Sequence, residues 1–83
     1  TVIYVQMPDG TIEHVTIPWY SNNTIYTLKT ANQEQNGHLF ASQHLFRASG
    51  DYASAADPDS PLPNDAEVVA YETLIMVLEP PRS

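Results

Sequence analysis

The stretch TIYTLKTANQEQNG, residues 24–37, decides the fold of this 83-residue chain, because its composition suits a strand, a loop or a helix. Thr, Tyr and Asn are mediocre helix formers, so intrinsic propensity alone argues against a helix. The apolar spacing argues for one, since Ile25 and Leu28 recur at the helical period and Ala31-Asn32 fall on the same stripe. The order of the neighbouring elements depends on which signal prevails.

The ends of the stretch favour the helix. Asn23 or Thr24 would be a good N-cap, because a short polar side chain there can accept a hydrogen bond from a backbone N–H of the first turn. Gly37 suits the position just past a helix end, where the backbone often turns left-handed. Periodicity and caps together predict a helix that begins near Thr24 and ends before Gly37.

Residues 1–17 alternate as a β-hairpin does, with Ile3 and Val5 on one face and Tyr4 on the other. The segment Pro8-Asp9-Gly10-Thr11 has the residues of a turn. Ile12 breaks the alternation, because it lies three residues before Val15. We therefore expect a bulge within residues 10–13 that turns both side chains inward.

Beyond the helix, residues 49–72 contain a Pro-, Asp-, Ser- and Ala-rich stretch typical of an exposed loop, with a short strand or a turn expected at 68–71. Residues 73–79 alternate as a last strand, and the Pro-Pro tail at 80–83 resembles a linker. The predicted fold is α+β: a mixed sheet of four to five strands with one helix packed across it.

Composition limits the classes of partner. Ten acidic and three basic residues give a net charge of −7, which leaves too few cations for the phosphate contacts of nucleic-acid binding. A basic protein partner, or a merely solvated acidic surface, fits better. The longest apolar run, 74–78, is too short for a membrane span. There is no cysteine, and the start at Thr1 indicates a piece of a longer protein.

Four segments in order resemble the ubiquitin family. IYV at 3–5 is similar to its first strand, I-[FY]-V, and TIYTLKTANQEQNG at 24–37 is similar to its helix, T-I-x-x-V-K-x-x-x-Q-x-x-x-G. QHLFRAS at 43–49 falls where the family has Q-R-L-I-F-A-G, and TLIMVL at 73–78 resembles its T-L-H-L-V-L strand. The resemblance implies a β-grasp, ubiquitin-like domain over residues 1–79.

Two departures from the family carry information. The conjugating members end in R-L-R-G-G, whereas here the last strand is followed by Glu79-Pro80-Pro81-Arg82-Ser83, so we expect a domain that is not conjugated. Lys29 is the only lysine, at a position that matches a family lysine; a surface so poor in lysine would limit ubiquitination of the domain itself, and drift in composition explains the scarcity equally well. The resemblance implies a cytoplasmic or nuclear protein.

The resemblance also implies a shallow apolar binding surface on the sheet face opposite the helix, formed by Phe46, Ile75 and Val77 with Pro8 near one end. Strand alternation agrees, because Ile75 and Val77 must face away from Leu74 if that side chain points to the helix. Phe46 would be a large aromatic anchor. The remaining partner-binding candidates, at the rim, are His44 and Arg47. The alternative is that the 49–72 loop covers this surface.

Other residues and motifs give weaker evidence of a functional role. We expect Trp19 to pack against the start of the helix as a staple. Ser, His and Asp residues are present without a catalytic spacing, and His38 and His44 have no convincing third zinc ligand, so neither an enzyme nor a cofactor is predicted. Asn22-Asn23-Thr24 fits a glycosylation sequon, a pattern that often occurs by chance.

The sequence thus predicts a monomeric protein-interaction domain that docks a ubiquitin-pathway or proteasomal receptor through the exposed apolar face. The alternative is a structural or regulatory scaffold domain whose sheet face is covered within its parent protein or assembly.

Overall fold

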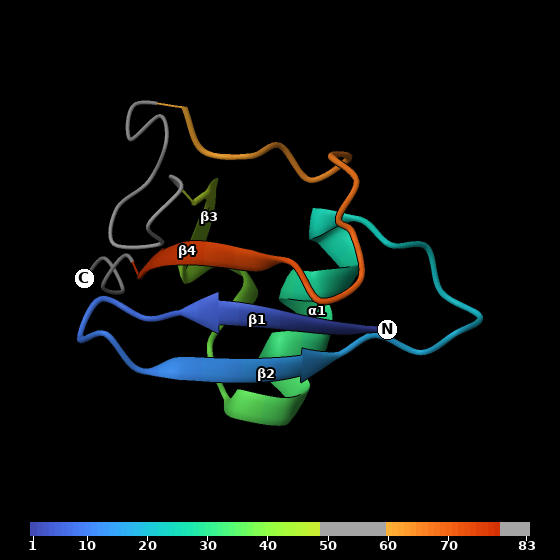
Figure 1. The fold of residues 1–83 in the computed structure, drawn as a ribbon, viewed down its shortest axis with the longest axis horizontal. Helices are drawn as coiled ribbons and strands as arrows, with labels where there is room; N and C mark the ends of the chain where they lie inside the picture. Colours follow the sequence, from blue (N-terminus) through green and yellow to red (C-terminus); the bar gives the residue numbers. More distant parts are fainter. Residues whose placement is uncertain (49–59, 79–83) are drawn as a thin grey trace.

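The computed structural model describes residues 1–48 and 60–78 (Figure 1). Its elements, in chain order, are β1 (Val2–Gln6), β2 (Ile12–Thr16), α1 (Ile25–Asn36), the short 3-10 helix η1 (Phe40–Ser42), β3 (Gln43–Arg47) and β4 (Thr73–Leu78). The expected tail at 80–83 and residues 49–59 of the expected loop lie outside the described residues.

The four strands form one mixed sheet in the order β2-β1-β4-β3. The central pair, β1 and β4, is parallel, and both outer pairs are antiparallel. The helix α1 packs across one face of this sheet, as Figure 1 shows. The predicted α+β fold is confirmed, with four strands, and its order of elements is consistent with a β-grasp topology.

The caps of α1 are those predicted. Thr24 is the N-cap in extended backbone conformation, and its hydroxyl accepts a hydrogen bond from the Thr27 N–H. Gly37 is left-handed, with φ 81°, and its N–H donates to the Gln33 carbonyl at 3.1 Å. No helix among the described residues is long and apolar enough to cross a membrane.

A backbone clamp, formed by residues 64–68, holds the start of α1. The N–H groups of Ile25 and Tyr26 donate to the carbonyls of Ala66 and Asn64, both at 2.9 Å. These N–H groups have no partner inside a helix, so the clamp supplies what the helix itself cannot. A single bridge between Thr24 and Glu67 continues it, and the residues after Val68 form a turn.

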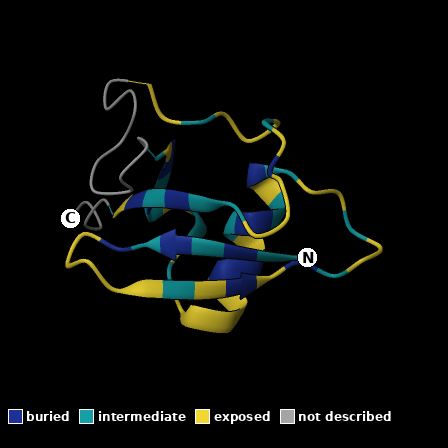
Figure 2. Cartoon of the chain, viewed as in Figure 1, coloured by how far each residue is buried: buried dark blue, intermediate teal, exposed yellow. Residues whose placement is uncertain are grey.

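The core lies between the sheet and α1. Its fully buried members come from every strand and from one stripe of the helix: Ile3, Val5, Val15, Ile25, Leu28, Leu45, Leu74 and Met76, with Ile17 just after β2. Figure 2 shows burial alternating with exposure along the strands, which is the pattern of a sheet with one covered face. The predicted helix stripe is therefore confirmed.

Two amide side chains are buried within this core and satisfy each other. Asn32 donates to the Gln43 side-chain carbonyl at 3.1 Å, and the Gln43 amide donates to the backbone carbonyls of Lys29 and His38, both at 3.0 Å. Asn36 donates in turn to the Asn32 side-chain oxygen at 2.7 Å. The network joins α1, β3 and the chain between them.

The free edge of β2 is covered by side chains of α1 instead of a fifth strand. The Gln35 amide accepts from the Thr16 N–H at 3.0 Å and donates to the Thr16 carbonyl at 2.7 Å. Asn36 donates to the His14 carbonyl at 3.3 Å. Gln35 thus makes both hydrogen bonds that a neighbouring strand would make with Thr16, and it occupies part of an edge that would otherwise be open to pairing.

One expectation about the hairpin is wrong. Met7 and Thr11 close a three-residue loop in which the Gly10 N–H donates to Met7 and Gly10 has φ 90°, the arrangement of a glycine bulge. The pairing is regular from Ile12 onward, and Ile12 lies opposite Gln6 with 46% of its surface exposed. Because the bulge is confined to the loop, it does not turn Ile12 inward.

The expected packing of Trp19 against the helix start is also wrong. Trp19 is 89% exposed and Tyr20 is 74% exposed. The two rings contact each other edge to face, with centroids 5.7 Å apart. The start of α1 is already held by the backbone clamp, which leaves no requirement for a tryptophan staple.

Replacing Gln43 by alanine tests the buried amide network. The substitution leaves the Asn32 amide and two backbone carbonyls without their donor or acceptor, so we expect the free energy of unfolding to fall by about 2–4 kcal/mol. Chemical denaturation measures this loss. Glu34→Gln, on the exposed side of α1, is the control and should change stability by less than about 0.5 kcal/mol. Equal effects of the two variants would contradict the assigned network.

Replacing Gln35 by alanine tests the covered edge. We expect a loss of about 1 kcal/mol in unfolding free energy and an increased tendency to self-associate, because Thr16 regains an unpaired N–H and C=O. Sedimentation velocity over a range of concentrations measures the association. Gln33→Ala, which removes a glutamine from the same helix without touching β2, should remain at the wild-type state of association. Unchanged association of Gln35→Ala would show that the edge needs no cover.

Candidate protein-interaction face

The face of the sheet opposite α1, here called the outer face, is formed by alternate residues of all four strands. One row runs straight across it, because Gln6 pairs with both Ile12 and Ile75, and Ile75 pairs with Phe46. A second row contains His14, Tyr4 and Thr73, and Val77 lies opposite His44. The register therefore brings Ile75, Val77, His44 and Phe46 onto one face, as predicted.

Exposure on this face is uneven. Val77 is 48% exposed and Ile12 is 46% exposed, whereas Ile75 is half-buried. Tyr4 and His14 contact each other edge to face, with centroids 5.1 Å apart. Two aliphatic side chains near water on a sheet face are the kind of exposure that protein-binding surfaces use. Ile12 was not among the predicted site residues, because the expected bulge would have turned it inward.

Phe46 does not have the exposure expected of an anchor. It lies on the outer face, yet only 7% of its surface is exposed. At the preceding position, the Leu62 N–H donates to the Leu45 carbonyl at 2.7 Å, and Leu62 packs against the core. Phe46 is not part of that core cluster, yet it is withdrawn from water on the outer face and does not offer an exposed anchor.

Arg47 does not rim the outer face. It pairs with Leu74, so alternation places it on the helix side of β3. Its guanidinium forms an ion pair with Glu72 and donates to the Glu67 carbonyl at 2.8 Å. Arg47 therefore ties β3 to the turn that precedes β4, and we withdraw it as a partner-binding residue. His44 lies on the outer face, half-buried, and is retained.

Pro8 lies at one end of the outer face. Because β1 and β4 run parallel, the loop after β1 emerges at the end of the sheet where β4 also ends, as Figure 1 shows. Pro8 is exposed there, beside Asp9, whose carboxylate accepts from the Thr11 N–H at 2.9 Å. This hydrogen bond, with a further one from the Thr11 hydroxyl, holds the pKa of Asp9 below its ordinary value of 3.8.

The single lysine lies away from the outer face, on α1. Its ammonium donates to the Asn64 side chain at 2.9 Å and lies 5.4 Å from the centre of the Phe40 ring. Partial burial lowers the pKa of Lys29 from its ordinary value, because the charged form loses water. Among the described residues, no group of three His, Asp or Glu side chains is arranged to hold a metal ion.

No protein-family model matches this sequence, and a comparison with curated proteins finds no match either. The sequence resemblance to the ubiquitin family therefore rests on the quoted segments and on the order of the elements.

The Asp9 hydrogen bond makes a prediction about acid stability. Since the folded-state pKa is lowered, the carboxylate stabilises the fold above its ordinary pKa, and this contribution is lost as pH falls through the lowered value. Asp9→Asn should therefore reduce the loss of stability between about pH 5 and pH 2. Denaturant midpoints measured across this range give the slope of stability against pH for wild type and for Asp9→Asn. Identical slopes for wild type and Asp9→Asn would contradict the assignment.

Proposed function

We propose that this chain is a non-conjugated, ubiquitin-like interaction domain that docks a receptor protein of the ubiquitin pathway through its outer face. The observation that carries the proposal is the exposure of Val77 and Ile12 on a sheet face that α1 does not cover. The order of elements supports the ubiquitin-like assignment, because hairpin, helix and two further strands give the same arrangement that the quoted segments imply.

The contact would be centred on β4. Val77 and the half-buried Ile75 alternate along this strand, and Ile12 adds an exposed apolar side chain on β2, beyond Gln6 in the same row. His44 lies opposite Val77 and adds a polar boundary. Such a surface has few aromatic anchors available, since Phe46 is buried, and it suits a small and transient interface.

A second candidate function is a structural or regulatory scaffold with this face covered inside a larger assembly. The burial of Phe46 favours it, because a large aromatic side chain on the outer face is already withdrawn from water. The two candidates differ in what becomes of Val77, which a docking domain leaves available and a scaffold domain covers permanently.

The experiment is an NMR titration of the labelled domain with a panel of ubiquitin receptors, including a ubiquitin-associated helix bundle and a proteasomal receptor. Docking predicts saturable shift changes at Ile12, Ile75 and Val77. Val77→Asp should weaken binding at least about tenfold, because it places a charge at the centre of an apolar contact, while the unfolding temperature changes little.

The matched control is Leu39→Asp, which introduces the same charge at an exposed aliphatic residue outside the strands. It should bind as wild type does. Absence of binding by every receptor, or an equal loss in the two variants, would contradict docking through the outer face. A fall in unfolding temperature confined to Val77→Asp would show that Val77 is part of the packed structure.

A further inference from the structure

A second surface, unrelated to the outer face, lies where β1 begins and β2 ends. It contains Trp19, Tyr20, Val69 and Tyr71, which are 89%, 74%, 66% and 70% exposed, and it is called here the aromatic end. Trp19 is the only tryptophan of the sequence. Exposed apolar side chains that gather at one end of a domain are the kind of exposure that marks an interaction surface.

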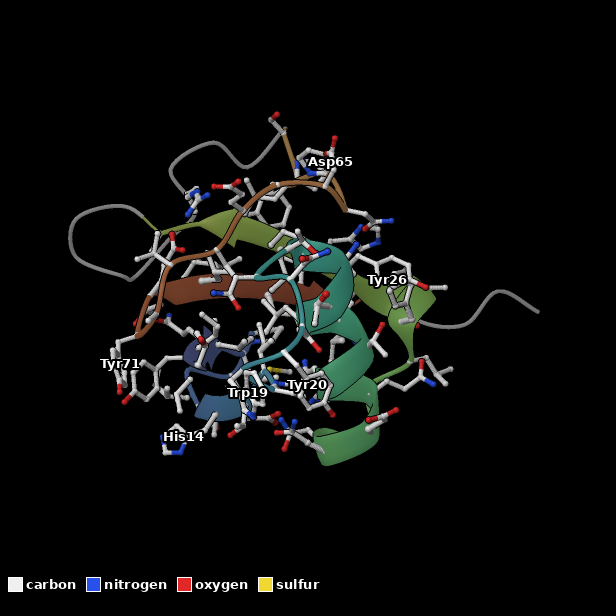
Figure 3. The ribbon with its side chains drawn as sticks, turned by 90° about the vertical axis from the view of Figure 1, so that its right-hand side faces the viewer. His14, Trp19, Tyr20, Tyr26, Asp65 and Tyr71 are labelled. Atoms are coloured by element: carbon white, nitrogen blue, oxygen red, sulfur yellow. The ribbon has the colours of Figure 1, made fainter. Side chains whose placement is uncertain are left out.

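Hydrogen bonds place the two parts of the aromatic end beside each other. The Ile17 N–H donates to the Thr1 carbonyl and the Tyr71 N–H donates to the Val2 carbonyl, both at 2.7 Å. The loop with Trp19 and the turn with Tyr71 therefore flank the first residues of β1 on opposite sides, about two strand spacings or ~10 Å apart. Figure 3 shows Trp19, Tyr20 and Tyr71 on the same side of the molecule.

Tyr71 holds its position at a conformational cost. Its φ is 64°, whereas the other two described residues with positive φ are Gly10 and Gly37. The turn is closed by the Glu72 N–H donating to the Val69 carbonyl at 3.1 Å, and a glycine would adopt this backbone without strain. A non-glycine residue is strained in this conformation, and such strain clusters at functional sites. An exposed ring gains too little from packing to offset it.

One unpaired carboxylate lies near the aromatic end in the described part of the chain. Glu67 is exposed and lines a hollow of about 370 Å³ with Asn22, Asn23, Thr24 and Val68. Its carboxylate is paired with no other described residue. The cations nearby are engaged, since Arg47 is held by Glu72 and the Thr1 ammonium donates to the Ile17 carbonyl at 2.9 Å.

We propose that the aromatic end binds an arginine-bearing segment of a partner protein. A guanidinium stacks on the face of a Trp or Tyr ring and keeps its hydrogen-bond donors free for a carboxylate, which a compact lysine ammonium does less well. Trp19 and Tyr71 provide two such faces, and Glu67 provides the acceptor at the adjoining hollow. The net charge of −7 attracts the same partner over a longer range.

The probe is a short arginine–glycine peptide, compared with lysine–glycine and serine–glycine peptides of equal length. Since Trp19 is the only tryptophan, its fluorescence reports binding at this surface directly. We expect a saturable change with the arginine peptide, a several-fold weaker affinity for the lysine peptide and none for the serine peptide. Equal response to the serine peptide, or preference for lysine, would overturn the proposal.

Two variants separate the aromatic contact from general attraction, because neither changes the net charge. Trp19→Ala and Tyr71→Gly should each weaken binding of a fluorescently labelled arginine peptide at least about tenfold. Tyr71→Gly should keep or raise the unfolding temperature, because it relieves the backbone strain. Tyr26→Ala is the matched control, since Tyr26 is a 58% exposed tyrosine on α1, and it should bind within about twofold of wild type.

Retained binding by Trp19→Ala would mean that the peptide merely follows the net charge, and this outcome would overturn the proposal. An equal loss in Tyr26→Ala would do so as well. The proposal is independent of the docking function, because Val77→Asp alters the outer face and leaves the aromatic end intact.

Discussion

The parallel pairing of β1 with β4 is the constraint on which the rest of the structure depends. It joins Tyr4 to Thr73, Val5 to Leu74 and Gln6 to Ile75, so that the first and last strands form the middle of the sheet. A parallel pair cannot be closed by a tight turn, and the intervening chain must leave the sheet and return. The helix, β3 and the backbone clamp at residues 64–68 all lie on that return path, and each is held in place by the core that the central pair completes.

The polar composition of α1 has a structural explanation in this arrangement. Asn32 enters the buried amide network, Gln35 and Asn36 bind the edge of β2, and Gln33 accepts a hydrogen bond from the Phe40 N–H at 2.7 Å. A helix of better formers such as Ala and Leu would have higher propensity but none of these contacts. The residues that make the stretch ambiguous in sequence are those that attach the helix to its neighbours.

Local patterns in the sequence were sufficient to predict the helix, most of the strands and the hairpin turn. The caps at Thr24, one of the two predicted candidates, and Gly37, the alternation in β1 and β4 and the turn around Gly10 depend on near neighbours, and the structure has them as predicted. The candidate site was predictable only in part. Ile75 and Val77 follow from alternation along one strand, whereas alternation places Phe46 on the outer face without indicating that it is buried.

The wrong predictions for Arg47 and Trp19 also concern contacts between residues that are distant in the sequence. Arg47 pairs with Glu72 across a long loop, and the helix start is held by carbonyls distant in sequence while Trp19 stays exposed. Neither contact leaves a periodic signal in the sequence. A tryptophan between a proline and the polar run Ser21-Asn22-Asn23 was the one local hint that this corner faces solvent.

The scarcity of lysine and arginine has a practical consequence for how the molecule meets proteases. Of the three such residues in the sequence, Lys29 lies inside α1 and Arg47 ends β3 with its side chain held. A trypsin-type protease needs several residues of free, extended backbone in its cleft; Lys29 is wound into a helix, and Arg47 is paired with Leu74 of β4. The rate of cutting at these two bonds would thus report how often α1 and β3 open, whether locally or with the whole fold.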